Sequence, residues 1–531
     1  MMVLEITGYL HYGTAGPRNE SLMYSKKNST DTTGSRKPGN GSSLAAGYMW
    51  TFGSTALPLA GAFIASLLIA RWMGPRAAGL INWTMALATI LLIPAKFGID
   101  GAASRMVSGY SVSEPELVGP AVSTSLLMRL LFTLPVCVIT VFFARWFAMF
   151  FGEEALEPLF RISALLILAV SINELTGLLA VGLKRFRLLF LMRTVMFVLR
   201  TGLVAGVIYV AAGPRGILGA YTAAALIPAI LIFSILLARY RNGSVFRIER
   251  PIWKKMLRLS APLAISGASV TIYSLLDKLM LGYFHGAASV GIYSIARNLL
   301  ETSLFPTFAL VMILRPALAG GWAAGDHDRC RSLIDRSIIN SVFYSVCVIT
   351  VFSCLAMPLI TGLFSIEFAD SAKILLMFLP LILMRSIGSV ILPGLIAADR
   401  ADTYAKLTFT GAILNFVLNL ALIPKYGADG AVISTLLSYL PVEILGLRAL
   451  WKVLPGFWRQ GNWSRIVRCL MTGVIVVLTY RSVIESPDRL LPAIAHAAVI
   501  ASIFTGGLVL TRAITFAEIR EILAPLFGVR R

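Results

Sequence analysis

The sequence contains few charged residues. Asp, Glu, Lys and Arg together make up 14% of its 531 residues, whereas 57% are hydrophobic. Soluble domains carry about 25% charged and about 45–50% apolar residues, so this composition excludes a soluble enzyme. Uncharged runs such as residues 51–70, 77–95 and 216–238 are each long enough to cross a bilayer as a helix, which takes about 20 apolar residues.

Cysteine and histidine are also scarce. The five cysteines are odd in number and include no C-x-x-C pair, and the four histidines are scattered along the chain. This pattern gives neither a disulfide framework nor the ligand spacing of a zinc site. The sequence contains no Walker A motif either. We therefore expect no nucleotide hydrolysis, no metal and no cofactor.

Acidic residues are outnumbered by basic ones, 26 to 47, which gives a formal net charge of +21. Basic stripes can indicate nucleic-acid binding, but here Lys and Arg gather in alternate short loops. Residues 239–258 hold seven of them and one acid, whereas the loops at 148–158 and 364–370 hold acids and no base. Because cytoplasmic loops of membrane proteins are enriched in Lys and Arg, the pattern predicts a membrane protein and no nucleic-acid partner.

The uncharged runs divide the chain into regions. Residues 1–47 are polar and are predicted to be a disordered cytoplasmic tail, without the apolar stretch of a secretory signal. The regions after it are an N-terminal six-helix lobe (48–239), a basic cytoplasmic linker (240–258), a C-terminal six-helix lobe (259–452), an appended helix pair (463–512) and a cytoplasmic tail (513–531). Fourteen candidate spans fill these regions, at 49–71, 78–98, 122–147, 159–183, 188–212, 216–239, 259–284, 289–317, 334–363, 371–397, 403–424, 428–451, 463–482 and 490–512. The even number of spans and the basic loops place both termini in the cytoplasm, and residues 99–120 and 516–531 are predicted to be interfacial helices.

The chain also repeats itself. The segment Ala70–Ile81 resembles Gly282–Tyr293 at an offset of 212 residues, with two glycines five apart in each copy. Gly216–Ala220 resembles Gly427–Ala431 at an offset of 211. Six spans return the chain to its starting side, so the two lobes are predicted to be parallel repeats, a transporter architecture that holds substrate between its halves. The repeated glycines are expected to form tight turns between helices. The fold class predicted is therefore an all-α polytopic membrane protein with about 14 transmembrane helices around a central cavity.

Several segments resemble a known family. They are Ala70–Gly79 with Phe97–Arg105, then Leu257–Leu263 with Asp277–Tyr293, and most specifically Asn415–Gly427. Over about residues 45–455 the chain resembles the polysaccharide transporter (Wzx-like flippase) branch of the multidrug/oligosaccharidyl-lipid/polysaccharide exporter superfamily, which is related to lipid II flippases. The resemblance implies two lobes that rock about a cavity and move a lipid-linked oligosaccharide, with a polyprenyl-pyrophosphate carrier, across the inner membrane.

Ionisable residues inside the predicted spans need an explanation, because each costs at least about 2.5–3.5 kcal/mol in mid-membrane. Seven basic and four acidic residues fall in this class, and this basic excess suits an anionic substrate such as a pyrophosphate. The candidate substrate-binding residues are Arg297, Arg200, Glu301, Asp277, Arg129, Arg385, Asn415 and Asn419.

Arg297 is the central candidate. It lies one helical turn before Glu301, and at the offset of 212 it corresponds to Met85, so the first lobe lacks this charge. Two interpretations stay open: Glu301 holds the guanidinium until substrate phosphate competes for it, or the pair only neutralises itself.

Other polar residues in the spans have structural alternatives. Asn415 and Asn419 are one turn apart, and helix packing is the favoured role for their amides. Arg193 and Lys278 are expected to extend toward the membrane surface.

Export or flipping of a lipid-linked saccharide for a cell-surface polysaccharide is the favoured function. A cation-coupled multidrug exporter of the same superfamily is the alternative, although its cationic substrates would favour an acidic cavity. A membrane enzyme of polysaccharide assembly would need a sizeable outer loop, and no predicted outer loop exceeds about a dozen residues. We expect the chain to be no enzyme, and its partners to be the lipid-linked substrate, membrane lipid and other polysaccharide assembly proteins.

Overall fold

The computed structural model describes residues 41–239, 249–457, 460–484, 487 and 490–514. The predicted helix at 516–531, most of the two predicted tails and the first part of the predicted linker lie outside these residues. Within them the chain is helical and contains no strand. In chain order the α-helices are α2 (Gly41–Lys96), α3 (Ile99–Ser113), α4 (Val118–Phe142), α5 (Ala144–Phe150), α6 (Leu156–Gly182), α7 (Phe186–Tyr209), α8 (Gly213–Arg239), α9 (Arg250–Ser303), α10 (Phe305–Ala323), α11 (His327–Leu363), α12 (Ala369–Ala397), α13 (Ala401–Val453), α14 (Gln460–Val483) and α15 (Leu490–Leu510). Two short 3₁₀ helices are η1 (Pro115–Leu117) and η2 (Ile366–Phe368).

Among the described residues, eleven helical stretches are long and apolar enough to cross a membrane. Three of them, at 53–96, 271–323 and 402–453, contain 44, 53 and 52 residues. Because a helix rises 1.5 Å per residue and a bilayer core is about 30 Å thick, each of these three is long enough for two crossings. Counting them twice gives fourteen crossings, so the predicted all-α polytopic fold is confirmed.

Some boundaries differ from those expected. The helix α2 begins at Gly41, so residues 41–47 extend the first span instead of belonging to a disordered tail. The predicted linker is helical from Arg250, where α9 begins. The predicted span at 289–317 is divided at Leu304, because Pro306 has no backbone N–H and fits the first turn of a new helix, α10.

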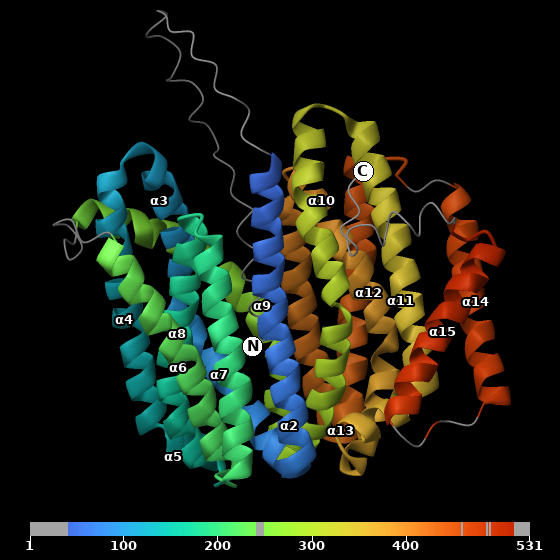
Figure 1. Cartoon of the computed structure of the whole chain (residues 1–531), viewed down its shortest axis with the longest axis horizontal. Coiled ribbons are helices and arrows are strands. Elements are labelled where there is room, and N and C mark those ends of the chain that lie inside the picture. The colour runs from blue at the N-terminus through green and yellow to red at the C-terminus, as the bar shows by residue number, and fades with distance from the viewer. Residues whose placement is uncertain (1–40, 240–248, 458–459, 485–486, 488–489, 515–531) are drawn as a thin grey trace, which may run out of the picture.

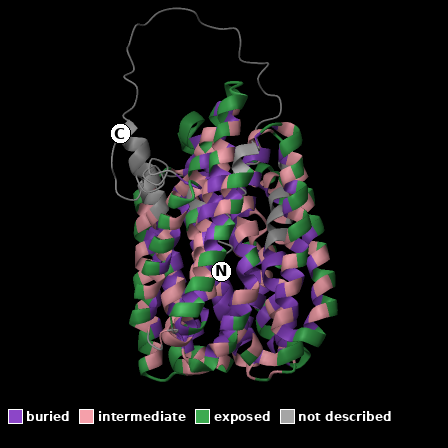
Figure 2. Cartoon of the chain, turned by 90° about the vertical axis from the view of Figure 1, so that its right-hand side faces the viewer, coloured by how far each residue is buried: buried purple, intermediate pink, exposed green. Residues whose placement is uncertain are grey.

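The helices form two bundles with α2 and α9 at the centre (Figure 1). Helices α3 to α8 lie on one side, α10 to α13 lie on the other, and α14 and α15 pack against the outside of α11. Buried residues run through the interior, and exposed residues cover the outer faces (Figure 2). Many of these outer residues are large and apolar, such as Phe142 (81% exposed) and Val198 (59% exposed), as expected of helices that face lipid.

The first repeat is visible in the backbone. Gly74 breaks α2 with φ 73° and ψ 178°, and Gly286 breaks α9 with φ 77° and ψ 179°. Only glycine adopts this region of φ and ψ without strain, so these two turns are as predicted. The second match has no such geometry, because Gly427 breaks α13 at φ 56° whereas Gly216 lies inside α8.

Gly79 and Gly291 are not turn residues, contrary to the expectation. Both are helical, and each meets the backbone of the other lobe. A Cβ at position 79 would lie 1.7 Å from the carbonyl oxygen of Ala287, and one at position 291 would lie 2.1 Å from that of Pro75. At the offset of 212, Gly79 corresponds to Gly291 and Pro75 corresponds to Ala287. The two contacts are therefore equivalent, and together they form a pseudo-twofold contact between the repeats. We call the end of the bundle that contains Gly74, Gly286 and this contact the glycine end.

Candidate substrate site between the lobes

A cleft lies between the lobes, inward from the glycine end. Its lining comes from α2, α7, α8 and α9, and the space within it, including the part open to solvent, is about 1090 Å³. The charged side chains on it are Arg200, Lys278, Arg297 and Glu301, which makes three cations and one anion. The uncharged polar side chains that line it are Ser66, Asn82, Tyr221, Thr271, Ser274, Asn298 and Thr302. The cleft is therefore suited to an anion that also carries hydroxyl groups.

The two walls of the cleft differ because the repeats differ. Asp277, Arg297 and Glu301 of the second lobe correspond to Ala65, Met85 and Thr89 in the first. The α2 wall is mainly apolar, with Phe63, Ile69 and Met85 among its side chains. The α9 wall carries three of the four charges, and the fourth, Arg200, comes from α7.

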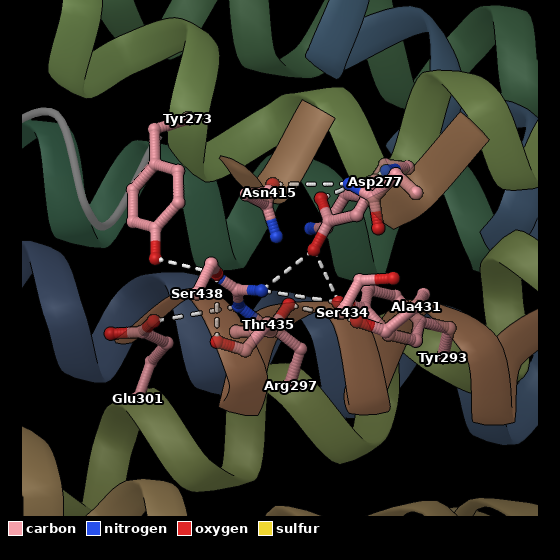
Figure 3. A network of polar contacts seen from close by, with 12 residues as sticks. Tyr273, Asp277, Tyr293, Arg297, Glu301, Asn415, Ala431, Ser434, Thr435 and Ser438 are labelled. Atoms are coloured by element: carbon pink, nitrogen blue, oxygen red, sulfur yellow. Dashed lines mark hydrogen bonds and ion pairs between the residues drawn. The ribbon is translucent and has the colours of Figure 1, made fainter. Parts of the chain in front are cut away.

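A buried ion network extends from the α9 wall into the second lobe (Figure 3). Arg297 donates from Nη1 to Asp277 Oδ2 at 2.7 Å, and its Nε lies 3.5 Å from Glu301 Oε1. Arg385 from α12 donates to Glu301, and the Tyr293 hydroxyl donates to Asp277. Two cations thus meet two carboxylates in a region where an unpaired charge is costly. Arg297 is neutralised in this arrangement.

Lys278 does not extend toward the membrane surface, contrary to the expectation. Its side chain lines the cleft, while the neighbouring Asp277 points into the ion network. This difference follows from the turn of about 100° between successive helical residues. Arg200 lines the cleft too, with its guanidinium 4.5 Å from the ring centre of Tyr221. Within the described residues, neither Lys278 nor Arg200 has a carboxylate within 4.0 Å. They are the two cations best placed to meet an anion.

Five predicted site residues do not line the cleft. Asp277 and Arg385 belong to the ion network, and the other three are Arg129, Asn415 and Asn419. Arg129 is fully buried in α4, where it forms an ion pair with Asp100 at the start of α3. Asn419 donates from Nδ2 to Asn415 Oδ1 at 3.0 Å, and both side chains are buried inside the second lobe. The hydrogen bond between the two asparagines fits a role in helix packing. A part in substrate binding stays a prediction for all three residues.

Sequence reasoning missed two amides in the cleft. Asn298 donates from Nδ2 to Ser66 Oγ at 3.2 Å, a hydrogen bond between the lobes. Asn82 donates to the Ala78 carbonyl at 2.8 Å. Each was detectable only by its position, since Asn298 follows Arg297 and Asn82 follows the repeated segment that ends at Ile81.

Burial decides one further expectation. Arg193 is buried with its side chain near Gly177 of α6, so it does not extend toward the membrane surface as expected. In the described part of the chain, no three His, Cys, Asp or Glu side chains come together as a group that could hold a metal ion.

The sequence of the chain matches two known protein families. Residues 44–320 match the family described as "Polysaccharide biosynthesis protein", and residues 262–421 match the family MatE. The probable low-salt glycan biosynthesis flippase Agl15 of Haloferax volcanii is 23% identical over 423 residues, which cover 78% of this chain and 85% of that protein. The lipid II flippase MurJ of Bacillus subtilis is 23% identical over 206 residues, 36% of this chain and 38% of its own.

Solved structures share the fold. Lipid II flippase MurJ in an inward closed conformation aligns with a TM-score of 0.68 and 16% identity, over 88% of this chain and 99% of its own. An inward-facing multidrug resistance MATE family transporter of the MOP superfamily aligns with a TM-score of 0.65 and 14% identity, over 76% of this chain and 98% of its own.

Proposed function

We propose, given that this chain belongs to the polysaccharide biosynthesis protein family, that it is a flippase that moves a lipid-linked saccharide across the membrane by alternating access of its two lobes. The observation that carries the proposal is the cleft between the repeats, which has a cationic wall on α9 and a mainly apolar wall on α2. A substrate that joins an anionic group to a saccharide and a lipid matches these surfaces. The protein acts as a transporter and not as an enzyme.

The anionic group is a pyrophosphate, bound first by Lys278 and Arg200. Both are basic side chains on the cleft lining, and charge-assisted hydrogen bonds to phosphate oxygens are stronger than neutral ones. Arg297 is a bidentate donor, but it is already bound to Asp277 and Glu301. Substrate phosphate would have to compete with these carboxylates, and Arg385 would keep Glu301 paired after the exchange.

The orientation in the membrane follows from loop charge. The basic segments at 184–187 and 250–258 lie at the end of the bundle opposite the glycine end, and the acidic segments at 153–157 and 367–370 lie at the glycine end. By the positive-inside rule, the glycine end lies on the outer side of the inner membrane, and both termini lie on the cytoplasmic side. The lobes touch at the glycine end, so this conformation is closed to the outside.

A multidrug exporter is the second candidate, because residues 262–421 match MatE. Cationic drugs would meet Arg200, Lys278 and Arg297 with Glu301 as the one carboxylate on the lining, so the charges of the cleft disfavour this function.

Reconstitution separates the two candidates. The purified protein in proteoliposomes should move a fluorescent polyprenyl-pyrophosphate saccharide between leaflets and should not transport ethidium under a proton or sodium gradient. Ethidium transport without saccharide translocation would overturn the proposal. The matched control is the doubly substituted Lys278→Ala, Arg200→Ala protein, which should be inactive toward the saccharide.

A further inference from the structure

An arginine of the first lobe is bonded to a helix end of the second lobe. Arg71 in α2 donates from Nη1 to the carbonyl oxygens of Gly362 (2.8 Å) and Leu363 (3.4 Å). These are the last two residues of α11, whose final carbonyls have no acceptor role within their own helix. The helix dipole places partial negative charge at this end, so it attracts a guanidinium. The contact lies at the glycine end and crosses between the lobes.

The equivalent position in the other repeat makes a different contact. At the offset of 212, Arg71 corresponds to Tyr283, and the two carbonyl residues correspond to Phe150 and Phe151. The Tyr283 ring packs on those two rings, with centroid distances of 5.4 and 6.5 Å. This contact also crosses between the lobes, from α9 to the end of α5. The same pseudo-symmetric position is therefore polar on one side of the molecule and aromatic on the other.

The two contacts respond differently to a rotation of the lobes. A hydrogen bond weakens steeply with distance and angle, and Arg71, which is exposed, can exchange its carbonyl partners for water. Aromatic packing tolerates several relative orientations of the rings, so Tyr283 can roll on Phe150 and Phe151 without separating from them. A rocking motion can thus break the Arg71 contact while the aromatic one persists.

The Arg71 side is also the side that closes the cleft. Phe63 lines the cleft, and its ring packs edge-on against Phe364 with a centroid distance of 6.3 Å. Phe364 follows directly on the two carbonyl residues and is fully buried. Movement of the α11 end away from Arg71 would therefore draw Phe364 from Phe63 and open the cleft toward the glycine end.

We propose that Arg71 is the latch that holds the glycine end closed, and that the lobes open there by release of Arg71 from the end of α11 while Tyr283 remains packed as the hinge. The inference rests on the proposed function, because a latch matters only if the lobes alternate. Its test measures the opening itself and does not depend on a substrate.

The test uses spin labels at positions 209 and 366 of the full-length protein in a cysteine-free background. Tyr209 and Ile366 are 92% and 74% exposed. Tyr209 ends α7 of the first lobe and Ile366 begins η2 of the second, and the C-terminal end of α7 and the segment that joins α11 to α12 both lie at the glycine end (Figure 1). Arg71→Ala should raise the ratio of a longer, open distance to the closed one by about three- to tenfold, the range for loss of one exposed charge-assisted bond. Arg71→Lys keeps a donor and should restore most of the closed population.

The matched control is Arg76→Ala. Arg76 is an exposed arginine five residues along α2, and its partner Glu153 (3.1 Å) belongs to the same lobe. This variant should keep the wild-type distance distribution. An unchanged distribution in Arg71→Ala, or an equal change in both variants, would overturn the latch. If wild-type protein moves no saccharide but Arg71→Ala still opens selectively, the proposed function fails and the latch stands; if wild type transports and Arg71→Ala does not open, only the latch fails.

Discussion

Arg297 Nη1 lies 2.7 Å from Asp277 Oδ2, and this ion pair joins the two halves of α9 across the break at Gly286. The pair therefore fixes the angle between two neighbouring crossings of the second lobe. It also means that Arg297 has a structural role in addition to any contact with substrate.

Removing only one member of this pair should destabilise the protein. Arg297→Ala leaves Asp277 buried without its cation, and breaking a buried pair in this way costs about 3–5 kcal/mol. The double variant Arg297→Gln, Asp277→Asn leaves no uncompensated charge and should recover most of the stability. Thermal unfolding of the purified proteins in one detergent measures both effects. A single variant as stable as the double variant would contradict the structural role.

Lys278 should be needed for transport but not for stability. It lines the cleft without a carboxylate partner within 4.0 Å in the described chain, so its removal leaves no buried anion unpaired. We expect Lys278→Ala to lower saccharide translocation by about tenfold or more, the loss expected for a hydrogen bond between charged groups, and Lys278→Arg to retain part of it. Lys373→Ala is the control, because Lys373 pairs with Asp429 outside the cleft. Equal translocation by Lys278→Ala and wild type would remove Lys278 from the site.

The glycine contact between the lobes should not tolerate a methyl group. In Gly79→Ala the new Cβ would overlap the Ala287 carbonyl oxygen, so the lobes must move apart at the glycine end. We expect a loss of about 1–3 kcal/mol of stability, as for overpacked cores, together with impaired translocation. Gly219→Ala provides the comparison, since nothing lies within 4 Å of a Cβ there. The idea is wrong if both alanine variants unfold at the same temperature as wild type.

The ion pair of Arg129 with Asp100 should contribute to stability. Both residues are buried, and Arg129 also reaches the Ala95 carbonyl at 3.5 Å, so Arg129→Ala should cost about 3–5 kcal/mol. The exposed pair of Arg161 with Glu157 is the reference, and Arg161→Ala should cost no more than about 0.5 kcal/mol. A stable Arg129→Ala protein that fails only in saccharide binding would instead support the predicted role in the substrate site.

The two ends of the bundle should be accessible from opposite sides of the membrane. A cysteine at Glu154, an exposed position at the glycine end, should react with a membrane-impermeant maleimide in intact cells. A cysteine at Lys254, exposed near the start of α9, should react only after the cells are opened. Labelling of both from the same side would overturn the proposed orientation.

The sequence by itself determined the crossings, the repeat and the glycine turns. Hydropathy is a property of consecutive residues, so fourteen crossings could be counted without knowing any contact. The turns at Gly74 and Gly286 were predictable for a similar reason, because the repeated motif is local and the backbone conformation there requires glycine.

Only the tertiary structure decided which polar groups face the cleft. Helical phase placed Arg297 and Glu301 on one face, but it could not show that Asp277 binds Arg297 while Lys278 lines the cleft. The close approach of Gly79 to Ala287 was equally hidden. The direction in which a helix face points is set by packing against residues far away in the sequence, and hydropathy carries no information about those partners.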